Sequence, residues 1–136
     1  MYPDTRITHD RTPSSYIGII SAHGAHTPNP MPHDTLTIGN VLRQSGYDTA
    51  LTGKWHLGNT LDHSPNAFGY NHGHGFHCPW CDFYTHRTQK DKYDWHRNGE
   101  YVEEEGHCTD LETGFAIDFI TNTRDKTKPF FYLCFL

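Results

Sequence analysis

Apolar residues along this 136-residue chain first follow a helical spacing and then an extended one. Asp34 or Thr35 can cap the start of the predicted helix, and Gly46 can end it in the left-handed conformation. Residues 47–52 are apolar and β-favouring, which predicts a strand. A helix, a glycine and a strand in this order form half of an α/β repeat. The apolar face of the helix is marked by Leu36, Ile38, Val41 and Leu42.

The same order of elements returns near the end of the chain. Residues 109–112, Thr-Asp-Leu-Glu, have the form of a capping box and predict the start of a second helix. Residues 130–136 show little polar alternation, which predicts a strand buried on both faces of a mostly parallel sheet, with Cys134 as a buried thiol. The buried side of the second helix is expected to carry Leu111, Phe115, Ala116, Phe119 and Ile120.

The remaining segments are predicted to be irregular. The exception is Asn98-Gly99, a pair that indicates a tight hairpin turn. We expect one α/β unit with an irregular lead-in (1–32), a helix and strand (33–58), an irregular and hairpin insert (59–107) and a final helix and strand (108–136). Because a strand buried on both faces needs more neighbours than this sequence offers, we expect the chain to be a fragment of a larger domain.

Composition excludes several classes of protein. Hydrophobic residues make up 35% of the chain and aromatic residues 14%, which is not a disordered composition. The net charge of −5 gives no sign of a nucleic-acid partner. We find no segment that resembles a signal peptide or a transmembrane span. The 12 histidines are unusual in number, and most are expected on polar loops.

The end of the first predicted strand carries candidate chemistry. Gly53 is followed by Lys54, Trp55 and His56. In an extended chain residues i and i+2 point to the same face, so Lys54 and His56 are expected to project together. Ligands of open α/β sheets bind beyond the carboxyl ends of the strands, and a cation beside an imidazole there suits an anion. By themselves these residues could equally be a solvated lysine and a packed loop histidine.

Residues 46–58, GYDTALTGKWHLG, resemble the second signature of the sulfatase family, in its arylsulfatase and steroid-sulfatase branch. Weaker similarities follow in the same order as in the family, at residues 68–70, 74–76, 101–110, 116–120 and 128–131. The resemblance implies an alkaline-phosphatase-like α/β fold, present here only as the N-terminal part of the catalytic domain. It also implies hydrolysis of sulfate monoesters with a formylglycine nucleophile and one Ca²⁺ ion.

The resemblance assigns roles to two residues of this chain. Lys54 would contact both the sulfate and the formylglycine, and His56 would hydrogen-bond the formylglycine hydroxyl and help to expel sulfate. The family's nucleophile motif, Cys or Ser-x-Pro-Ser or Thr-Arg, is not matched, since residues 11–15 read Arg-Thr-Pro-Ser-Ser. The nucleophile and the calcium ligands are therefore expected outside this chain, and the isolated chain is expected to be inactive.

The family also implies partners and a location. The expected substrate is a sulfated small molecule, a sulfated glycan or a sulfated steroid. The expected location is the secretory pathway, either lysosomal, in the endoplasmic reticulum or extracellular.

Two other interpretations stay open. Cys78 and Cys81 have the spacing of a zinc knuckle, which His107 and Cys108 could complete as four ligands. A disulfide among Cys78, Cys81 and Cys108 is the alternative that the family's secretory location favours. The chain could also be a non-catalytic remnant, and the aromatic-rich residues 76–84 could line a substrate pocket or simply pack in the core.

Overall fold

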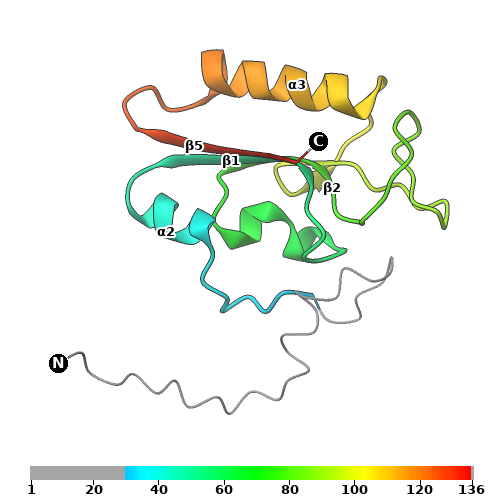
Figure 1. Cartoon of the computed structure of the whole chain (residues 1–136), viewed down its shortest axis with the longest axis horizontal. Helices are drawn as coiled ribbons and strands as arrows, with labels where there is room; N and C mark the ends of the chain where they lie inside the picture. The colour runs from blue at the N-terminus through cyan, green and yellow to red at the C-terminus, as the bar shows by residue number, and fades with distance from the viewer. Residues whose placement is uncertain (1–29, 136) are drawn as a thin grey trace, which may run out of the picture.

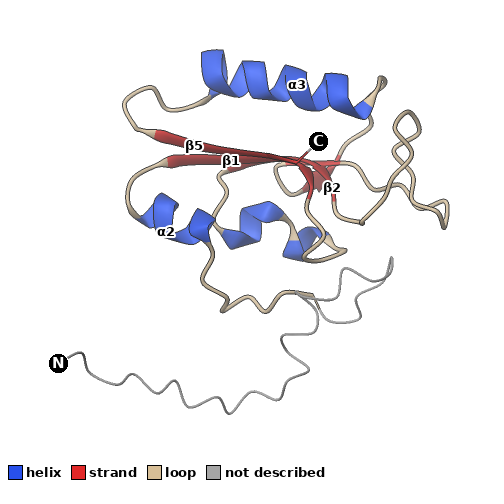
Figure 2. Ribbon diagram, viewed as in Figure 1, coloured by secondary structure: helices blue, strands red, loops and turns tan. Residues whose placement is uncertain are grey.

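Residues 30–135, which the computed structural model describes, form a five-stranded sheet with helices on both faces (Figures 1 and 2). The helix α3 covers one face of the sheet, and α2 lies with two short 3₁₀ helices on the other. The α/β architecture predicted from the sequence is confirmed. Along the chain the elements are α2 (Ile38–Gln44), β1 (Asp48–Lys54), η1 (Leu61–His63), η2 (Pro65–Phe68), β2 (His72–Phe76), β3 (His96–Arg97), β4 (Glu100–Tyr101), α3 (Cys108–Asp118), the π-helical turn η3 (Phe119–Thr123) and β5 (Phe130–Phe135).

The strand order is β4-β3-β2-β1-β5, which places β1 between β2 and the outer strand β5. Strand β1 runs parallel to both β2 and β5, whereas β3 is antiparallel to β2 and to β4. The carboxyl ends of β1, β2 and β5 therefore meet at one edge of the sheet. Most of the predicted lead-in, including residues 11–15, lies outside the described residues.

The helix α2 begins later than the sequence predicts. Thr37 is its N-cap, in a capping box with Asn40, so neither Asp34 nor Thr35 fills that role. Gly46 follows the helix with a φ of +88°, as predicted. Within the described residues the predicted apolar face is mostly unpacked, because Ile38 and Val41 are exposed and Leu42 is only half-buried. Gly39 faces the core instead, where an added Cβ would lie 2.8 Å from the backbone oxygen of Phe68.

The helix α3 begins earlier than predicted. His107 is its N-cap, and its Nδ1 accepts a hydrogen bond from the Thr109 backbone N–H at 3.2 Å. The predicted capping box is therefore wrong, and Glu112 lies on the buried side of the helix. Of the predicted apolar side, Phe119 is fully buried while Ile120 is exposed.

Strand β5 is present and parallel to β1, but the prediction that it is buried on both faces is wrong for this chain. It is the outer strand of the sheet, and both Phe130 and Phe135 are exposed. Cys134 is exposed as well, which corrects its prediction as a buried thiol. The reason is that within the described residues no further strand lies beyond β5.

Strand β2 was not predicted, because its sequence His-Gly-His-Gly-Phe lacks β-branched residues. Gly75 has a φ of +139°, and a Cβ there would lie 2.3 Å from the Gly53 backbone oxygen. Two glycines thus let β1 and β2 approach closely. The predicted hairpin turn is confirmed, since Asn98 and Gly99 both have positive φ between β3 and β4.

The sheet separates two apolar clusters. One contains Leu51, Trp55, Phe68, Tyr70 and Met31, and the other contains Phe76, Cys81, Trp95 and Cys108. Among residues 30–135, no helix has the length and apolar character needed to cross a membrane.

Candidate functional site

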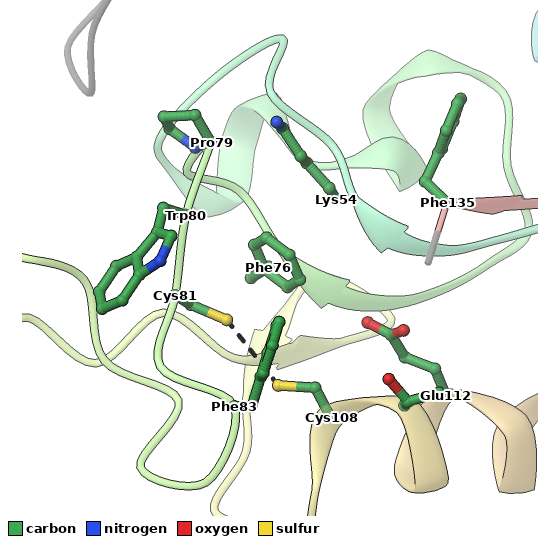
Figure 3. A pocket seen from close by; sticks show the side chains of 10 residues that line it. Lys54, Phe76, Pro79, Trp80, Cys81, Phe83, Cys108, Glu112 and Phe135 are labelled. Carbon is green, nitrogen blue, oxygen red and sulfur yellow. Dashed lines mark hydrogen bonds between the residues drawn. The ribbon is translucent and has the colours of Figure 1, made fainter.

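Lys54 is the last residue of β1 and lies at the carboxyl edge of the sheet. It is paired in register with Phe76 at the end of β2, and Gly53 is paired with Phe135 at the end of β5. Its exposed side chain lines a cavity of about 220 Å³ (Figure 3). The other walls of this cavity include Phe76, Trp80, Cys81, Cys108 and Glu112.

His56 does not continue the extended strand. Its backbone is left-handed, with a φ of +57°, and its N–H donates to the His77 carbonyl at 2.9 Å. Trp55 turns into the core, where its Nε1–H donates to the His63 carbonyl at 2.6 Å. The simple alternation used in the sequence prediction therefore ends at Lys54, and within the described residues His56 is not part of the cavity wall.

Lys54 and His56 nevertheless act on each other electrostatically. Burial, and secondly the ammonium of Lys54, lower the pKa of His56 below its usual value. His56 Nε2 is buried and finds no hydrogen-bond partner within the described residues. A cation beside a neutral imidazole with a free nitrogen can bind an anionic group and exchange a proton with it.

Sequence reasoning missed Glu112 as a residue of the cavity. Its side chain is only 3% exposed, and its Oε1 has no hydrogen-bond partner among residues 30–135. Burial raises its pKa to about 7. Its position one helical turn after Cys108 was the available signal, but the apparent capping box concealed it. The cavity thus holds a cation and a carboxyl group that is protonated in part near neutral pH.

The four predicted zinc ligands do not assemble. Cys81 Sγ and Cys108 Sγ lie 3.8 Å apart, but no group of three or more metal donors within residues 30–135 includes them. His107 is used as a helix cap, and the Cys78 backbone N–H donates to Asp94. The described geometry therefore does not support the zinc-knuckle interpretation.

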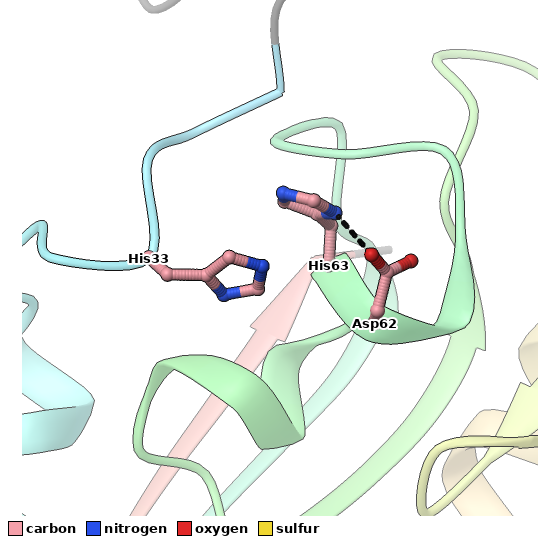
Figure 4. Close-up of side chains that lie close together, drawn as sticks. All are labelled: His33, Asp62 and His63. Carbon is pink, nitrogen blue, oxygen red and sulfur yellow. Dashed lines mark ion pairs between the residues drawn. The ribbon is translucent and has the colours of Figure 1, made fainter.

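Within the described part of the chain, one group could hold a metal ion. The donor atoms of His33, Asp62 and His63 all lie within 4.8 Å of one another (Figure 4). Two imidazoles suit a transition metal better than Ca²⁺, which prefers oxygen ligands. These residues therefore do not fit the calcium site of the family.

Several histidines expected on polar loops are fully buried. His77 Nδ1 lies 2.8 Å from Asp94, and His74 Nε2 lies 2.6 Å from Glu104. Burial alone would raise the pKa of Asp94, but hydrogen bonds from His77 and Cys78 hold it below its usual value. These pairs tie Asp94 and Glu104 to β2 and to the residue just after it. Among residues 30–135 the fully buried histidines are His74, His77, His86 and His96.

Comparison with known proteins supports the family resemblance. The sulfatase family model matches residues 6–136. N-acetylglucosamine-6-O-sulfatase of Bacteroides thetaiotaomicron is 37% identical over 100 residues, covering 71% of this chain and 15% of the relative. N-acetylgalactosamine-6-sulfatase of Mus musculus is 29% identical over 127 residues, covering 81% of this chain and 24% of the relative. The chain thus spans between about one seventh and one quarter of these relatives.

Solved structures show the same partial correspondence. The crystal structure of Ps i-CgsB in complex with k-i-k-neocarrahexaose has a TM-score of 0.68 and 26% identity, over 81% of this chain and 28% of that one. A structure of a protein in complex with its substrate D-glucosamine-2-N,6-O-disulfate has a TM-score of 0.60 and 30% identity, over 81% and 20%. The described fold therefore corresponds to one part of a larger domain in those proteins.

Proposed function

Because this chain belongs to the sulfatase family, we propose that it supplies part of an active site that hydrolyses sulfate monoesters. The observation that carries the proposal is the placement of Lys54. It ends β1 inside the 46–58 motif, at the edge where three parallel strands terminate, and its side chain lines a cavity. Open α/β sheets bind their ligands at this edge.

The chemistry of the two residues suits sulfate-ester cleavage. Negative charge shifts among the sulfate oxygens during transfer, and the Lys54 ammonium stabilises that charge more strongly in a partly dry pocket than in water. His56, which its lowered pKa keeps neutral near pH 7, holds or moves a proton at Nε2. The unpartnered Nε2 also fits a hydroxyl group nearby, such as that of a formylglycine. When present, formylglycine supplies the nucleophile of this reaction.

The substrate that we propose is a sulfated sugar. Two relatives carry names of amino-sugar 6-sulfatases, and two similar structures hold carbohydrate ligands. The cavity beside Lys54 offers the aromatic faces of Trp80 and Phe83, against which a sugar ring can stack. A secretory-pathway location stays a prediction of the family resemblance.

Replacement of Lys54 tests the proposal. The protein encoded by the complete reading frame that contains this chain is assayed with 4-nitrophenyl sulfate and with a glucosamine 6-sulfate. We expect Lys54→Ala to lower turnover by about 100-fold or more, the usual loss when one charge-stabilising donor is removed. The control is Lys126→Ala, an exposed lysine in the loop before β5. Turnover of Lys54→Ala near that of the control would contradict the proposal.

An assay of the isolated chain tests separately whether it holds only part of the active site. It holds Lys54 and His56 but no matched nucleophile motif and, within residues 30–135, no group of oxygen ligands suited to calcium. We expect no hydrolysis of the aryl sulfate above buffer when Ca²⁺ is added. Calcium-dependent turnover by the pure 136-residue chain would show that the chain holds a complete site.

A further inference from the structure

We propose that Cys81 and Cys108 form a disulfide that ties the loop at residues 78–85 to the first turn of α3, and that Cys78 stays a free thiol despite its Cys-x-x-Cys spacing. The inference concerns the wall of the cavity beside Lys54 and needs no sulfatase activity for its test.

The two thiols face each other across the cavity wall. Their Sγ atoms lie 3.8 Å apart, and each residue is only 2% exposed (Figure 3). A disulfide bond is about 2 Å long, so small rotations of the two side chains close the remaining gap. The other two cysteines are placed differently: Cys78 is only partly buried, and Cys134 lies on β5 beside Thr52.

The backbones that carry the two thiols are already docked. The Cys108 backbone N–H donates to the Phe83 carbonyl at 2.9 Å, and Cys108 Sγ lies 4.0 Å from the Asp82 carbonyl. Cys81 and Cys108 also belong to one apolar cluster with Phe76 and Trp95. The helix and the loop are therefore already in contact where the bond would form.

The reaction is an exchange with a disulfide oxidant such as oxidised glutathione. The two S–H bonds of Cys81 and Cys108 break, one S–S bond forms between them, and two protons and two electrons are transferred, so that the oxidant becomes two thiols. The hydrogen bond with Cys108, and then burial, raise the pKa of Cys81. Since the thiolate is the reactive form, formation of the crosslink should be slow at neutral pH and faster at higher pH.

The bond would close a loop that includes most of the insert. A crosslink of this length restricts the unfolded chain and raises the melting temperature, in a domain of this size by roughly 10 °C. It would also hold Trp80 and Phe83 in place at the cavity.

Peptide mapping tests the pairing directly. The full chain is equilibrated with reduced and oxidised glutathione, its free thiols are blocked with iodoacetamide, and it is digested with trypsin and chymotrypsin. Chymotrypsin can cut after Trp80, which separates Cys78 from Cys81. We expect a linked peptide with Cys81 and Cys108, and blocked Cys78 and Cys134. The same oxidation in guanidinium chloride should lower the share of this pair.

Matched variants give the second measurement. Cys78→Ser should keep the linked peptide and the rise in melting temperature on oxidation, whereas Cys81→Ser and Cys108→Ser should lose both. Circular dichroism of each reduced variant reports whether it folds. A Cys78–Cys81 link in the native chain, or four blocked thiols after native oxidation, overturns the proposal.

Discussion

Glu112 shows how one buried side chain can set the pH dependence of this fold. Burial raises its pKa to about 7 in the folded chain, from 4.5 when exposed. Between these values the unfolded chain has lost the proton and the folded chain still holds it, so stability falls as pH rises. The cost is complete above about pH 7 and absent below about pH 4.5.

Replacement by glutamine removes this ionisation. We expect Glu112→Gln to raise the free energy of unfolding by up to about 3 kcal/mol at pH 8, with little gain at pH 4.5. Urea unfolding at the two pH values measures the difference. The exposed Glu105→Gln serves as control. An equal effect of Glu112→Gln at both pH values would show that the carboxyl group is not held protonated.

The histidines show the limit of sequence reasoning at the scale of residues. The prediction that Lys54 and His56 are site residues rests on the 46–58 motif, whose residue types are specific. Nothing local indicated that His74 and His77 are buried, since their partners Glu104 and Asp94 lie 30 and 17 residues away. Only tertiary structure brings such pairs together.

At the scale of elements, the N-cap of α2 is Thr37 and not the predicted Asp34 or Thr35, and substitutions can test this difference. Thr37 Oγ1 accepts from the Asn40 N–H at 3.1 Å and donates to the Phe68 carbonyl at 2.6 Å. We expect Thr37→Ala to destabilise the chain by about 1 kcal/mol, and Thr35→Ala to change it by less than about 0.5 kcal/mol. Denaturant midpoints compare the two variants. A larger loss of stability for Thr35→Ala than for Thr37→Ala would show that Thr35 caps the helix, as the sequence predicts.

The contact between β1 and β2 gives a second test at this scale. Gly75 has a positive φ, and its Cβ position is blocked by the Gly53 backbone. We expect Gly75→Ala to lower stability by several kcal/mol, roughly the cost of a strained conformation and a backbone clash combined. Gly114 in α3 has open space around it, so Gly114→Ala should instead stabilise by about 0.5–1 kcal/mol. Thermal unfolding of both variants checks the contrast, and similar effects would contradict it.

The elements themselves were predicted unequally well. The two helices, β1, β5 and the Asn98-Gly99 hairpin follow from apolar periodicity and turn chemistry, which are local. Strand β2 does not, because its residue types serve contacts distant in sequence. Gly75 lets the strand approach Gly53 closely, and His74 pairs with Glu104 in the interior. The start of α2 differs from the prediction because the Thr37 hydroxyl also donates to a backbone group distant in sequence, the Phe68 carbonyl.

At the scale of the whole molecule, the described chain leaves apolar surface uncovered on both sides of the sheet. Ile38 and Val41 are exposed on α2, Ile117 on α3 and Ile120 on η3, and β5 is an outer strand with no neighbour on its far side among the described residues. Sequence reasoning expected β5 to be enclosed, and similar structures contain this fold as about a quarter of a longer chain. The apolar pattern of the sequence therefore fits packing contacts that are absent among the described residues.

Such surfaces should make the isolated chain associate, because contiguous apolar patches and unpaired strand edges drive self-assembly. We expect its mass in light scattering after gel filtration to rise with concentration. Ile117→Lys combined with Ile120→Lys should reduce this association, since charge on α3 and η3 opposes burial of that face. The control is Thr113→Lys, which adds a charge at a position that is also exposed on α3. A monomer at all concentrations would mean that these side chains are compatible with solvent, and that the apolar run of β5 needs no further cover.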